Sequence, residues 1–413
     1  HMSCTLLAPI GLVGAIFGVR ESTNRVATVV VAVVAFVVGF VPYVYLFVTS
    51  GSAAAWGPVS SLDDLVGVIT RRDYGGAFAF ASSGTDTDTT VARNLWALAV
   101  TIGRSWLWVP AIAGVVAIGV SIARPGNRLR WLGLAASLVL AGPFIVGSFN
   151  VAPESLGLYV CQRFHLLPVL LLCIPTAIAF EAGLSRVRLP SRAAWVAPLV
   201  VVITAATSLP YVSRVRTTSL TLLGRNALRS LPPDAIVIVR SDDTFYAQIY
   251  VQELEGERTD VTIVSWWLIV FPWYRERLAK QGLVLDPYAA TPGPWARRIA
   301  HQIWKTKRPL FTETQDPRFG PLFDAIPYGI FVNVPPPGAL APSLGEIVAK
   351  NRSLYAAFDL SDPRPGRDDE YPTAVHSRYA FTWLLIAKAL VDAGHPEDAK
   401  AAIAVAREIG PQP

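Results

Sequence analysis

The sequence has little charge and little sulfur. Of its 413 residues only 16% are charged, and it contains three cysteines and one methionine. Hydrophobic residues make up 52%, with a mean hydropathy of +0.42, so composition argues against one water-soluble domain and favours a membrane protein. Thirty of the 36 basic residues are arginines, dispersed without a basic stripe. The net charge of +6 therefore predicts no nucleic-acid partner.

The three cysteines, Cys4, Cys161 and Cys173, have no metal-ligand spacing, and we predict no metal site. Cys161 and Cys173 are separated by a helical stretch of about 18 Å, which is too long for a disulfide. A disulfide between Cys4 and Cys161 on the outer side stays open.

Six apolar blocks dominate the first half of the chain. A membrane-spanning helix needs about 20 residues, and these blocks approach or reach that length. We predict a polytopic region, residues 1–212, with about six transmembrane helices: Met2 to Val19, Val26 to Val48, Ser105 to Ala123, Trp131 to Phe149, Phe164 to Phe180 and Ala193 to Leu209. Their interiors carry no Asp, Glu, Lys or Arg, which counts against a coupled transporter.

Arginines mark alternate connections between the blocks, and such residues are retained on the cytoplasmic side. The three arginine groups are Arg20 with Arg25; Arg124, Arg128 and Arg130; and Arg186, Arg188 and Arg192. The chain is therefore predicted to be a multi-pass protein of the inner (plasma) membrane, with everything after Leu209 extracytoplasmic. Arg214 and Arg216 argue mildly against this, but a large exported domain crosses regardless of its charge.

Residues 213–370 predict a soluble α/β domain. LTLLGRNALRSL has helical spacing, AIVIVR predicts a buried strand, and residues 241–256 predict a helix with an apolar face of Phe245, Ile249, Tyr250 and Leu254. A second strand at 261–264 and a proline-led helix, FPWYRERLAK, follow. Together they predict a parallel βαβ unit with a right-handed crossover.

Ligands of parallel sheets bind at the carboxyl ends of the strands, where Asp242, Asp243, Trp266 and Trp267 are predicted to lie. The alternative is that Ser241 or an aspartate caps the helix while the tryptophans pack beneath it. No glycine-rich phosphate loop follows the first strand, so the sequence does not support nucleotide binding of the Rossmann type.

Residues 371–413 predict a tetratricopeptide-like helix pair. Its small and large apolar positions are Trp383, Ile386, Ala387, Leu390, Gly394, Ala399, Ile403, Ala406 and Pro411. One such unit cannot bury its own face, so it must pack on the preceding domain or on further repeats. His395 is predicted to be a solvated turn residue.

The stretch AWGPVSSLDDLVGVITRRDYGG, residues 55–76, is predicted to contain a helix lying in the outer membrane interface. Its apolar residues Leu62, Leu65, Val66 and Ile69 have helical spacing. Arg71 and Arg72 would project at head-group depth, where a guanidinium matches a phosphate. Trp56 and Tyr74 would anchor the two ends, as aromatic residues do at that level.

A second outer group is Arg163 with His165 at the mouth of the fifth block, within ESLGLYVCQRFHLLP. They are predicted either to bind a lipid head group or, in the case of the arginine, only to anchor the helix by snorkelling. Glu154 nearby could be a catalytic carboxylate, but it stands alone in the sequence.

Several segments carry a resemblance to a known family: PYVYLFV, AWGPVSSLDDLVGVITRRDYGG, RFHLLP, SLPPDAIVIVRSDDTF, YVQELEGERTDVTIVSWWLIVFPWY and the helix pair. In this order they resemble the second half of bacterial membrane proteins of domain-of-unknown-function family 2723. That family is similar to animal protein O-mannosyltransferases of the GT-C superfamily. The resemblance implies transfer of a sugar, mannose foremost, from a polyprenyl-phosphate donor to a hydroxyl of an acceptor protein outside.

The resemblance also implies an acidic base in an Asp-Gly-Glu-like segment, which this sequence does not match. The base is therefore expected in a segment before His1, and the catalytic residue stays unknown. His1 and Met2 are either native or a cloning remnant. The family's Trp-Gly-Asp reads Trp56-Gly57-Pro58 here, and its Gly-Asp-Asn-Asp-Thr is one residue shorter, at residues 241–244.

Two further readings remain beside the enzyme. One is a membrane-anchored tetratricopeptide scaffold, in which the arginines only anchor the chain. The other, a transporter, is weaker. We expect no cofactor beyond the lipid-linked sugar as substrate; the partners are membrane lipid, that donor and an acceptor protein.

Overall fold

The computed structural model describes residues 2–412 apart from a set of short gaps and three longer ones: 53–54, 56, 71, 75–86, 107, 149–151, 155, 186–198, 200–201, 204, 208, 211, 213–215, 288–291, 314–324 and 367–369. The chain divides into two compact units. The helical unit comprises His1–Val48 and Val59–Leu209, and the α/β unit comprises Thr49–Pro58 and Pro210–Pro413.

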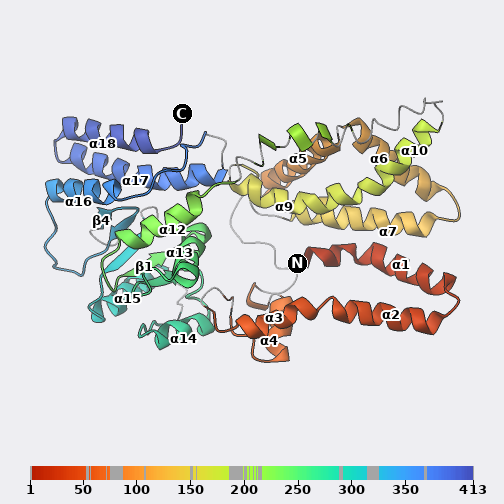
Figure 1. The fold of residues 1–413 in the computed structure, drawn as a ribbon, viewed down its shortest axis with the longest axis horizontal. Helices are drawn as coiled ribbons and strands as arrows, with labels where there is room; N and C mark the ends of the chain where they lie inside the picture. Colours follow the sequence, from red (N-terminus) through yellow and green to blue (C-terminus); the bar gives the residue numbers. More distant parts are fainter. Residues whose placement is uncertain are drawn as a thin grey trace. The chain divides into compact units, whose positions relative to one another are not determined.

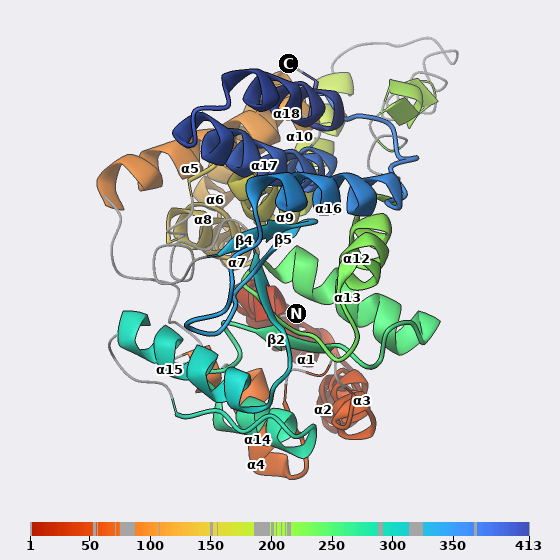
Figure 2. The same ribbon diagram turned by 90° about the vertical axis from the view of Figure 1, so that its left-hand side faces the viewer.

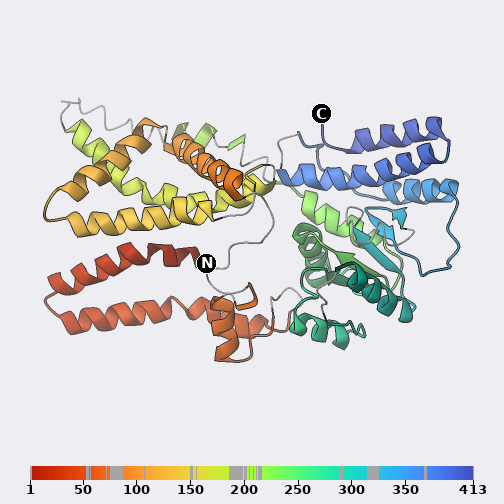
Figure 3. The same ribbon diagram turned by 180° about the vertical axis from the view of Figure 1, so that it is seen from behind.

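The helical unit is built of helices (Figures 1 and 3). In chain order the helices are η1 (Met2–Leu7), α1 (Ala8–Glu21), α2 (Arg25–Val38), α3 (Val41–Thr49), α4 (Leu62–Ile69), η2 (Arg72–Tyr74), α5 (Thr87–Trp106), α6 (Val109–Ala123), α7 (Arg128–Val139), the π-helical turn η3 (Leu140–Phe144), α8 (Ile145–Gly147), α9 (Leu156–Leu171) and α10 (Cys173–Leu184). α1 and α2 as well as α6 and α7 are joined by connections of a few residues.

Two helical segments of the described residues are long and apolar enough to cross a membrane, Arg25–Thr49 and Arg128–Gly147. Two bent pairs would raise the number to four if each pair forms one span: α5 with α6, and α9 with α10. The first predicted block is divided between η1 and the 14-residue α1. Most of the last block lies outside the described residues. Six spans therefore remain a prediction.

The predicted span Ser105 to Ala123 is not one helix. α5 continues to Trp106, and α6 starts at Val109 with Pro110 in its first turn, a position that suits a helix start because proline has no N–H to leave unpaired. The Trp108 ring folds back over Gly103, where a Cβ would come within 2.3 Å of it. The break between α5 and α6 thus depends on Gly103 and Pro110. The hydrophobicity pattern did not reveal that these two residues together end one helix and start the next.

The fifth block also starts earlier than predicted. α9 begins at Leu156, so Arg163 lies on a helix rather than in a loop, two positions before His165 on the same helix. A turn at Leu172 separates α9 from α10, and the two axes differ by 40°.

The α/β unit has a five-stranded mixed sheet with the order β2-β1-β3-β5-β4 (Figure 2). β1 pairs in parallel with β2 and β3, and the β3–β5 and β4–β5 pairs are antiparallel. The elements are α12 (Ser219–Ser230), β1 (Ile236–Val239), α13 (Asp242–Glu255), β2 (Thr262–Ser265), α14 (Pro272–Lys280), α15 (Pro292–Lys305), β3 (Leu310–Glu313), β4 (Ile326–Tyr328), β5 (Phe331–Asn333), α16 (Leu344–Ala356), α17 (Glu370–Asp392) and α18 (Pro396–Ile409).

The parallel βαβ unit predicted from the sequence is confirmed in β1, α13 and β2. α13 ends at Gly256, whose φ of 68° suits glycine at a helix end. Its predicted apolar face is partly wrong, because Tyr250 and Leu254 are 46% and 73% exposed. Ala247, Gln248 and Val251 are buried instead, since α13 packs on α12 as well as on the sheet.

α17 and α18 form an antiparallel hairpin (Figure 1). Trp383, Ile386 and Leu390 of α17 pack against Ala399, Ala402 and Ala406 of α18. Apolar residues of α16, among them Ile347 and Val348, cover the hairpin, which therefore packs on the preceding domain. Its tetratricopeptide class remains a prediction.

The contact between α12 and α13 gives a test of this packing. A Cβ at Gly224 would lie 2.4 Å from the carbonyl oxygen of Ala247. Because this oxygen belongs to the backbone of α13, it cannot turn aside as a flexible side chain can. We expect Gly224→Ala to destabilise the α/β unit by about 1–3 kcal/mol, measured by thermal unfolding in detergent. Gly345→Ala in α16, where a Cβ meets nothing within 4 Å, is the control. An unchanged melting temperature for Gly224→Ala would contradict this packing.

Candidate functional site

The carboxyl ends of β1 and β3 form the topological switch point of the sheet. From β1 the chain passes to β2 on one side, and β3 then pairs with β1 on the other side. Open α/β sheets bind ligands at such a point. The residues at this position are Arg240, Ser241 and Glu313.

A carboxylate of the protein occupies this position. Glu313 Oε2 accepts hydrogen bonds from the backbone N–H groups of Arg240, at 2.9 Å, and Ser241, at 3.1 Å. The Ser241 hydroxyl donates to Glu313 Oε1. Backbone N–H groups after the first strand bind phosphate in nucleotide-binding sheets. Here they bind an internal anion, which agrees with the absence of a glycine-rich phosphate loop.

Asp243 is held by a largely buried ion pair with Arg378 of α17. The Arg378 Nη2 to Asp243 Oδ1 distance is 2.8 Å, and the side chains are 16% and 12% exposed. Arg378 Nη1 also donates to the Thr244 hydroxyl at 2.8 Å. Ser241 has the N-cap position of α13, but its side chain makes no capping hydrogen bond. The predicted cap is thus replaced by contacts that tie α13 to α17 and β3.

Asp242 remains exposed at the start of α13. Loss of hydration beside the surrounding protein atoms, together with the charge of Asp243, raises the pKa of its carboxyl. Burial and the charge of Asp242 likewise raise the pKa of Tyr246, which is 42% exposed. These two side chains can form hydrogen bonds with an external polar group.

The two tryptophans after β2 differ in their surroundings. Trp266 is 2% exposed and packs on Trp295, with ring centroids 4.7 Å apart. Trp267 is 46% exposed, and the Arg240 guanidinium lies over its ring at 5.3 Å. Trp266 therefore packs in the core, which is the alternative to ligand binding considered above. Trp267 instead offers an aromatic face at the carboxyl-end edge of the sheet, where Asp242 also lies.

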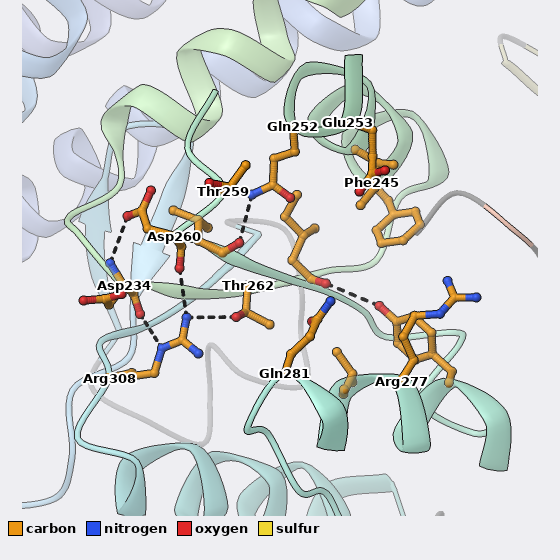
Figure 4. A pocket seen from close by; sticks show the side chains of 15 residues that line it. Asp234, Phe245, Gln252, Glu253, Thr259, Asp260, Thr262, Arg277, Gln281 and Arg308 are labelled. Atoms are coloured by element: carbon orange, nitrogen blue, oxygen red, sulfur yellow. Dashed lines mark hydrogen bonds between the residues drawn. The ribbon is translucent and has the colours of Figure 1, made fainter. Parts of the chain in front are cut away.

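A separate cavity of about 400 Å³ lies along the outer edge of β2, between α13 and α14 (Figure 4). Two side chains close the strand edge itself. The Tyr274 hydroxyl accepts from the Ser265 N–H at 3.0 Å and donates to the Ile263 carbonyl at 3.3 Å, and the Gln252 amide donates to the Val261 carbonyl at 2.8 Å. These hydrogen bonds occupy backbone groups at the outer edge of β2. The cavity beyond this edge therefore offers side chains to a ligand.

Arg308 links the chain segments at one end of this cavity by hydrogen bonds (Figure 4). Its guanidinium donates to the carbonyls of Asp234 and Asp260 and to the Thr262 hydroxyl. Burial lowers the pKa of Arg308. Within the described residues, the side chains of Glu253 and Gln281 have no hydrogen-bond partner, so both are available to a polar ligand in the cavity.

The tryptophan-glycine segment predicted to begin the outer loop docks on α14. Arg277 Nη2 donates to the Ala55 carbonyl at 3.2 Å, and a Cβ at Gly57, whose φ is 154°, would lie 3.4 Å from the Trp273 ring. Arg277 also lies over that ring at 5.2 Å. The α/β unit thus fixes the start of this loop. Trp56 itself lies outside the described residues.

The helix predicted in this stretch is present as α4, and its place in the membrane interface remains a prediction. A capping box between Ser61 and Asp64 starts it, and hydrogen bonds from Ser61 and Ser60 lower the pKa of Asp64 to about 2. Arg72 folds back over Gly67 and pairs with Asp63 at 2.8 Å on an exposed surface. Arg71 and the Tyr74 side chain lie outside the described residues.

Arg163 and His165 point to different surroundings. Arg163 is exposed, and no carboxylate in the described part of the chain pairs with it. His165 is fully buried, and its Nδ1 lies 2.8 Å from the Thr101 hydroxyl. That hydroxyl donates to the Ala97 carbonyl, so it accepts from Nδ1–H, and Nε2 is buried without a hydrogen-bond partner among the described residues. His165 is therefore not presented to a lipid head group.

Two expectations for this region are corrected. Glu154, predicted to stand alone, pairs with Arg93 of α5 at 3.0 Å. Cys161, one half of the disulfide left open above, is a buried thiol 3.8 Å from Oδ1 of Asn94. Both partners lie in α5, of which the predicted apolar block Ser105 to Ala123 included only the last two residues, and so the sequence alone gave no sign of them.

Sequence reasoning also missed Glu313 and Arg378. The apolar and β-branched residues LFT directly precede Glu313, so they could have indicated a third strand. Arg378 lies on α17, 135 positions from Asp243, and no local pattern links the two residues.

Comparison with known proteins found two similarities, one to a family model and one to a whole protein. A family model described as TMEM260-associated domain 2 matches residues 221–289, which cover most of α12 and all of β1, α13, β2 and α14. Apart from Arg308, every residue that lines the β2 cavity falls within this match. The chain thus carries a domain similar to one associated with TMEM260.

The second similarity is to a curated protein that shares the name TMEM260 with the family model. The chain is 26% identical over 268 residues to the protein O-mannosyl-transferase TMEM260 of Mus musculus. The alignment covers 60% of this chain and 36% of the mouse protein, so the chain spans about a third of that relative's length. No solved structure matches the chain.

Removing one partner of the Asp243–Arg378 pair should be costly, because it leaves an unpaired charge in a largely buried place. We expect Arg378→Ala to destabilise the α/β unit by about 3 kcal/mol, which corresponds to a fall in melting temperature of roughly 6 °C or more. Lys388→Ala, which breaks an exposed pair with Asp392, should cost under about 0.5 kcal/mol. Equal effects of the two variants would show that the Arg378 contact does not stabilise the unit.

Tyr274 should make the stability of the α/β unit sensitive to alkali. Burial raises the pKa of Tyr274 to about 12, so the contribution of its neutral phenol is complete below about pH 10 and is lost as pH rises towards 12. The loss at that limit is up to about 2–3 kcal/mol. Urea unfolding between pH 9 and 11.5 should show a smaller decline for Tyr274→Phe than for wild type. Tyr250→Phe, at an exposed position, should behave as wild type.

Proposed function

We propose that this chain is part of a membrane glycosyltransferase that transfers a sugar, mannose foremost, from a polyprenyl-phosphate donor to a protein hydroxyl on the outer face of the membrane. The observation that carries the proposal is the similarity to a protein O-mannosyl-transferase over 60% of the chain. The apolar helices of the helical unit support membrane association.

The finer assignments belong to the same proposal. They are a GT-C-like membrane region at residues 1–212, an extracytoplasmic α/β domain at 213–370 and a tetratricopeptide-like pair at 371–413. We further propose membership of the bacterial family 2723 and a place in the inner membrane. The arginine-marked connections support this orientation.

The reaction needs a base and a group that stabilises the leaving phosphate. A carboxylate takes the proton of the acceptor hydroxyl while its oxygen attacks the anomeric carbon, forming the glycosidic bond. The bond between that carbon and the phosphate oxygen breaks, and polyprenyl phosphate leaves with its electrons. The carboxylate that acts as base is not assigned, and a guanidinium would stabilise the negative charge on the departing phosphate.

Among the three candidate arginines, Arg163 is favoured for the phosphate role. Arg72 already pairs with Asp63, which lowers its attraction for a second anion. Arg163 is exposed and has no carboxylate partner among the described residues. An unpaired guanidinium can offer two parallel N–H groups to a phosphate.

The α/β unit is proposed to bind the acceptor polypeptide. Asp242 is exposed at the switch point and Trp267 is exposed just after the neighbouring strand β2, while the β2 cavity offers the side chains of Glu253 and Gln281. Hydrogen-bonding groups beside an aromatic face suit a polypeptide.

The scaffold hypothesis is the second candidate. Ser241, Asp243 and Glu313 are engaged in contacts within the unit, which is what a structural junction would show. The hairpin of α17 and α18 is also an element common in interaction proteins. A transporter remains the weakest alternative.

Transfer of labelled mannose from polyprenyl-phosphate mannose by the full-length protein tests the proposal. We expect Arg163→Ala to lower kcat about 100- to 1000-fold, as loss of one group that stabilises a developing anion does. Arg163→Lys should retain part of the activity, because it keeps the charge but not the two parallel donors. Arg72→Ala and Arg71→Ala should have smaller effects.

Arg352→Ala, at an exposed position of α16, is the matched control and should transfer at the wild-type rate. Unchanged transfer in Arg163→Ala would rule out its phosphate role. Absence of transfer by the wild-type protein with this donor would favour the scaffold.

A further inference from the structure

The helical unit contains a second feature that the proposed reaction does not use: an apolar groove between α1 and α7. It has a volume of about 380 Å³ and is lined mainly by Ile10, Val13, Gly14 and Phe17 of α1, by Trp131 and Leu134 of α7, and by Ile174 of α10. α1 and α7 lie side by side along it (Figure 3). The stretch from Ile10 to Phe17 is about 10 Å long, enough for part of one acyl chain.

One end of the groove is cationic. Arg130, a lining residue, places its guanidinium over the Phe17 ring at 4.4 Å. Asn127, also a lining residue, starts α7 at the same end. The groove therefore combines an apolar floor with a cation and an amide at its mouth.

The surroundings of this mouth are strongly basic. Arg130 hydrogen-bonds to Glu21 at the end of α1, which brings the α1–α2 and α6–α7 connections together. These connections also carry Arg20, Arg25, Arg124 and Arg128, all of them exposed. Glu21 is the only carboxylate in the two connections, so the positive charges outnumber the negative one.

We propose that this groove is a binding site for one anionic phospholipid: its phosphate lies at Arg130 and Asn127, and an acyl chain lies along α1 and α7. Charge complementarity selects the head group, because basic pockets between membrane helices recognise anionic lipids. Trp131 lies beside the arginine, as interfacial aromatic residues do. Glu21 competes for Arg130, but both side chains of that pair are about half exposed or more, so a phosphate can replace the carboxylate.

The site is distinct from the proposed donor site. Arg130 belongs to the connections that the sequence assigns to the cytoplasmic side, whereas Arg163 belongs to the opposite side. The inference therefore does not depend on the sugar-transfer reaction.

Native mass spectrometry of the detergent-purified chain, titrated with phosphatidylglycerol or phosphatidylcholine, tests the proposal. We expect wild type to bind one phosphatidylglycerol at least tenfold more tightly than phosphatidylcholine. Arg130→Gln should reduce that preference about tenfold. Arg104→Gln, an exposed arginine of the same unit that does not line the groove, should leave it unchanged.

A second variant tests the acyl-chain part without changing charge. A Cβ at Gly14 meets nothing within 4 Å, so Gly14→Leu can fill the groove without a clash. We expect it to weaken phosphatidylglycerol binding about tenfold. Gly18→Leu on the same helix is the control, since a Cβ there also meets nothing within 4 Å and Gly18 does not line the groove.

Three results would overturn the proposal: equal binding of the two lipids by wild type, unchanged binding in both Arg130→Gln and Gly14→Leu, or displacement of phosphatidylglycerol by a lower concentration of polyprenyl phosphate. The last result would assign the groove to the donor lipid. A loss in Gly14→Leu that Gly18→Leu shares would also count against the groove.

Discussion

The Glu313 carboxylate joins the carboxyl ends of β1 and β3, and much of the α/β unit follows from that contact. It accepts hydrogen bonds from two backbone N–H groups at the switch point and from the Ser241 hydroxyl, and so fixes the start of α13 and the direction in which this helix leaves the sheet. With α13 in that direction, Asp243 faces Arg378 of α17. The switch point is thereby closed to phosphate, and Asp242 stays exposed there while Trp267 is exposed just after β2.

The helical unit obeys a different constraint, because polar side chains among apolar helices must find partners inside the unit. α5 and α9 satisfy it by facing each other with Thr101 opposite His165 and Asn94 opposite Cys161. Arg163, in the middle of α9, is exposed and has no carboxylate partner among the described residues. The basic groove mouth around Arg130 belongs to connections that the sequence assigns to the cytoplasmic side.

Local patterns predicted part of the α/β fold correctly. β1, β2 and the end of α13 at Gly256 follow from β-branched runs and a glycine stop, because these signals act over a few residues. Which residues of α13 are buried was harder to predict from the sequence, because the close contact with α12 at Gly224 determines the buried face of this helix. The bend between α5 and α6 likewise depends on how closely the Trp108 ring can approach Gly103, which hydropathy does not encode.

The sequence by itself determined that the chain has apolar helices followed by a parallel βαβ unit and a terminal helix pair, because periodicity and turn residues specify elements locally. Only the tertiary structure decided which polar residues remain available to a ligand. Asp243, Glu154 and Arg72 are engaged in ion pairs, whereas Arg163 has none with the part of the chain that the structure describes, and two of these three pairs join residues far apart in the chain. Pairing over such distances requires folding to bring the charges within a few ångströms, and no local pattern contains that information.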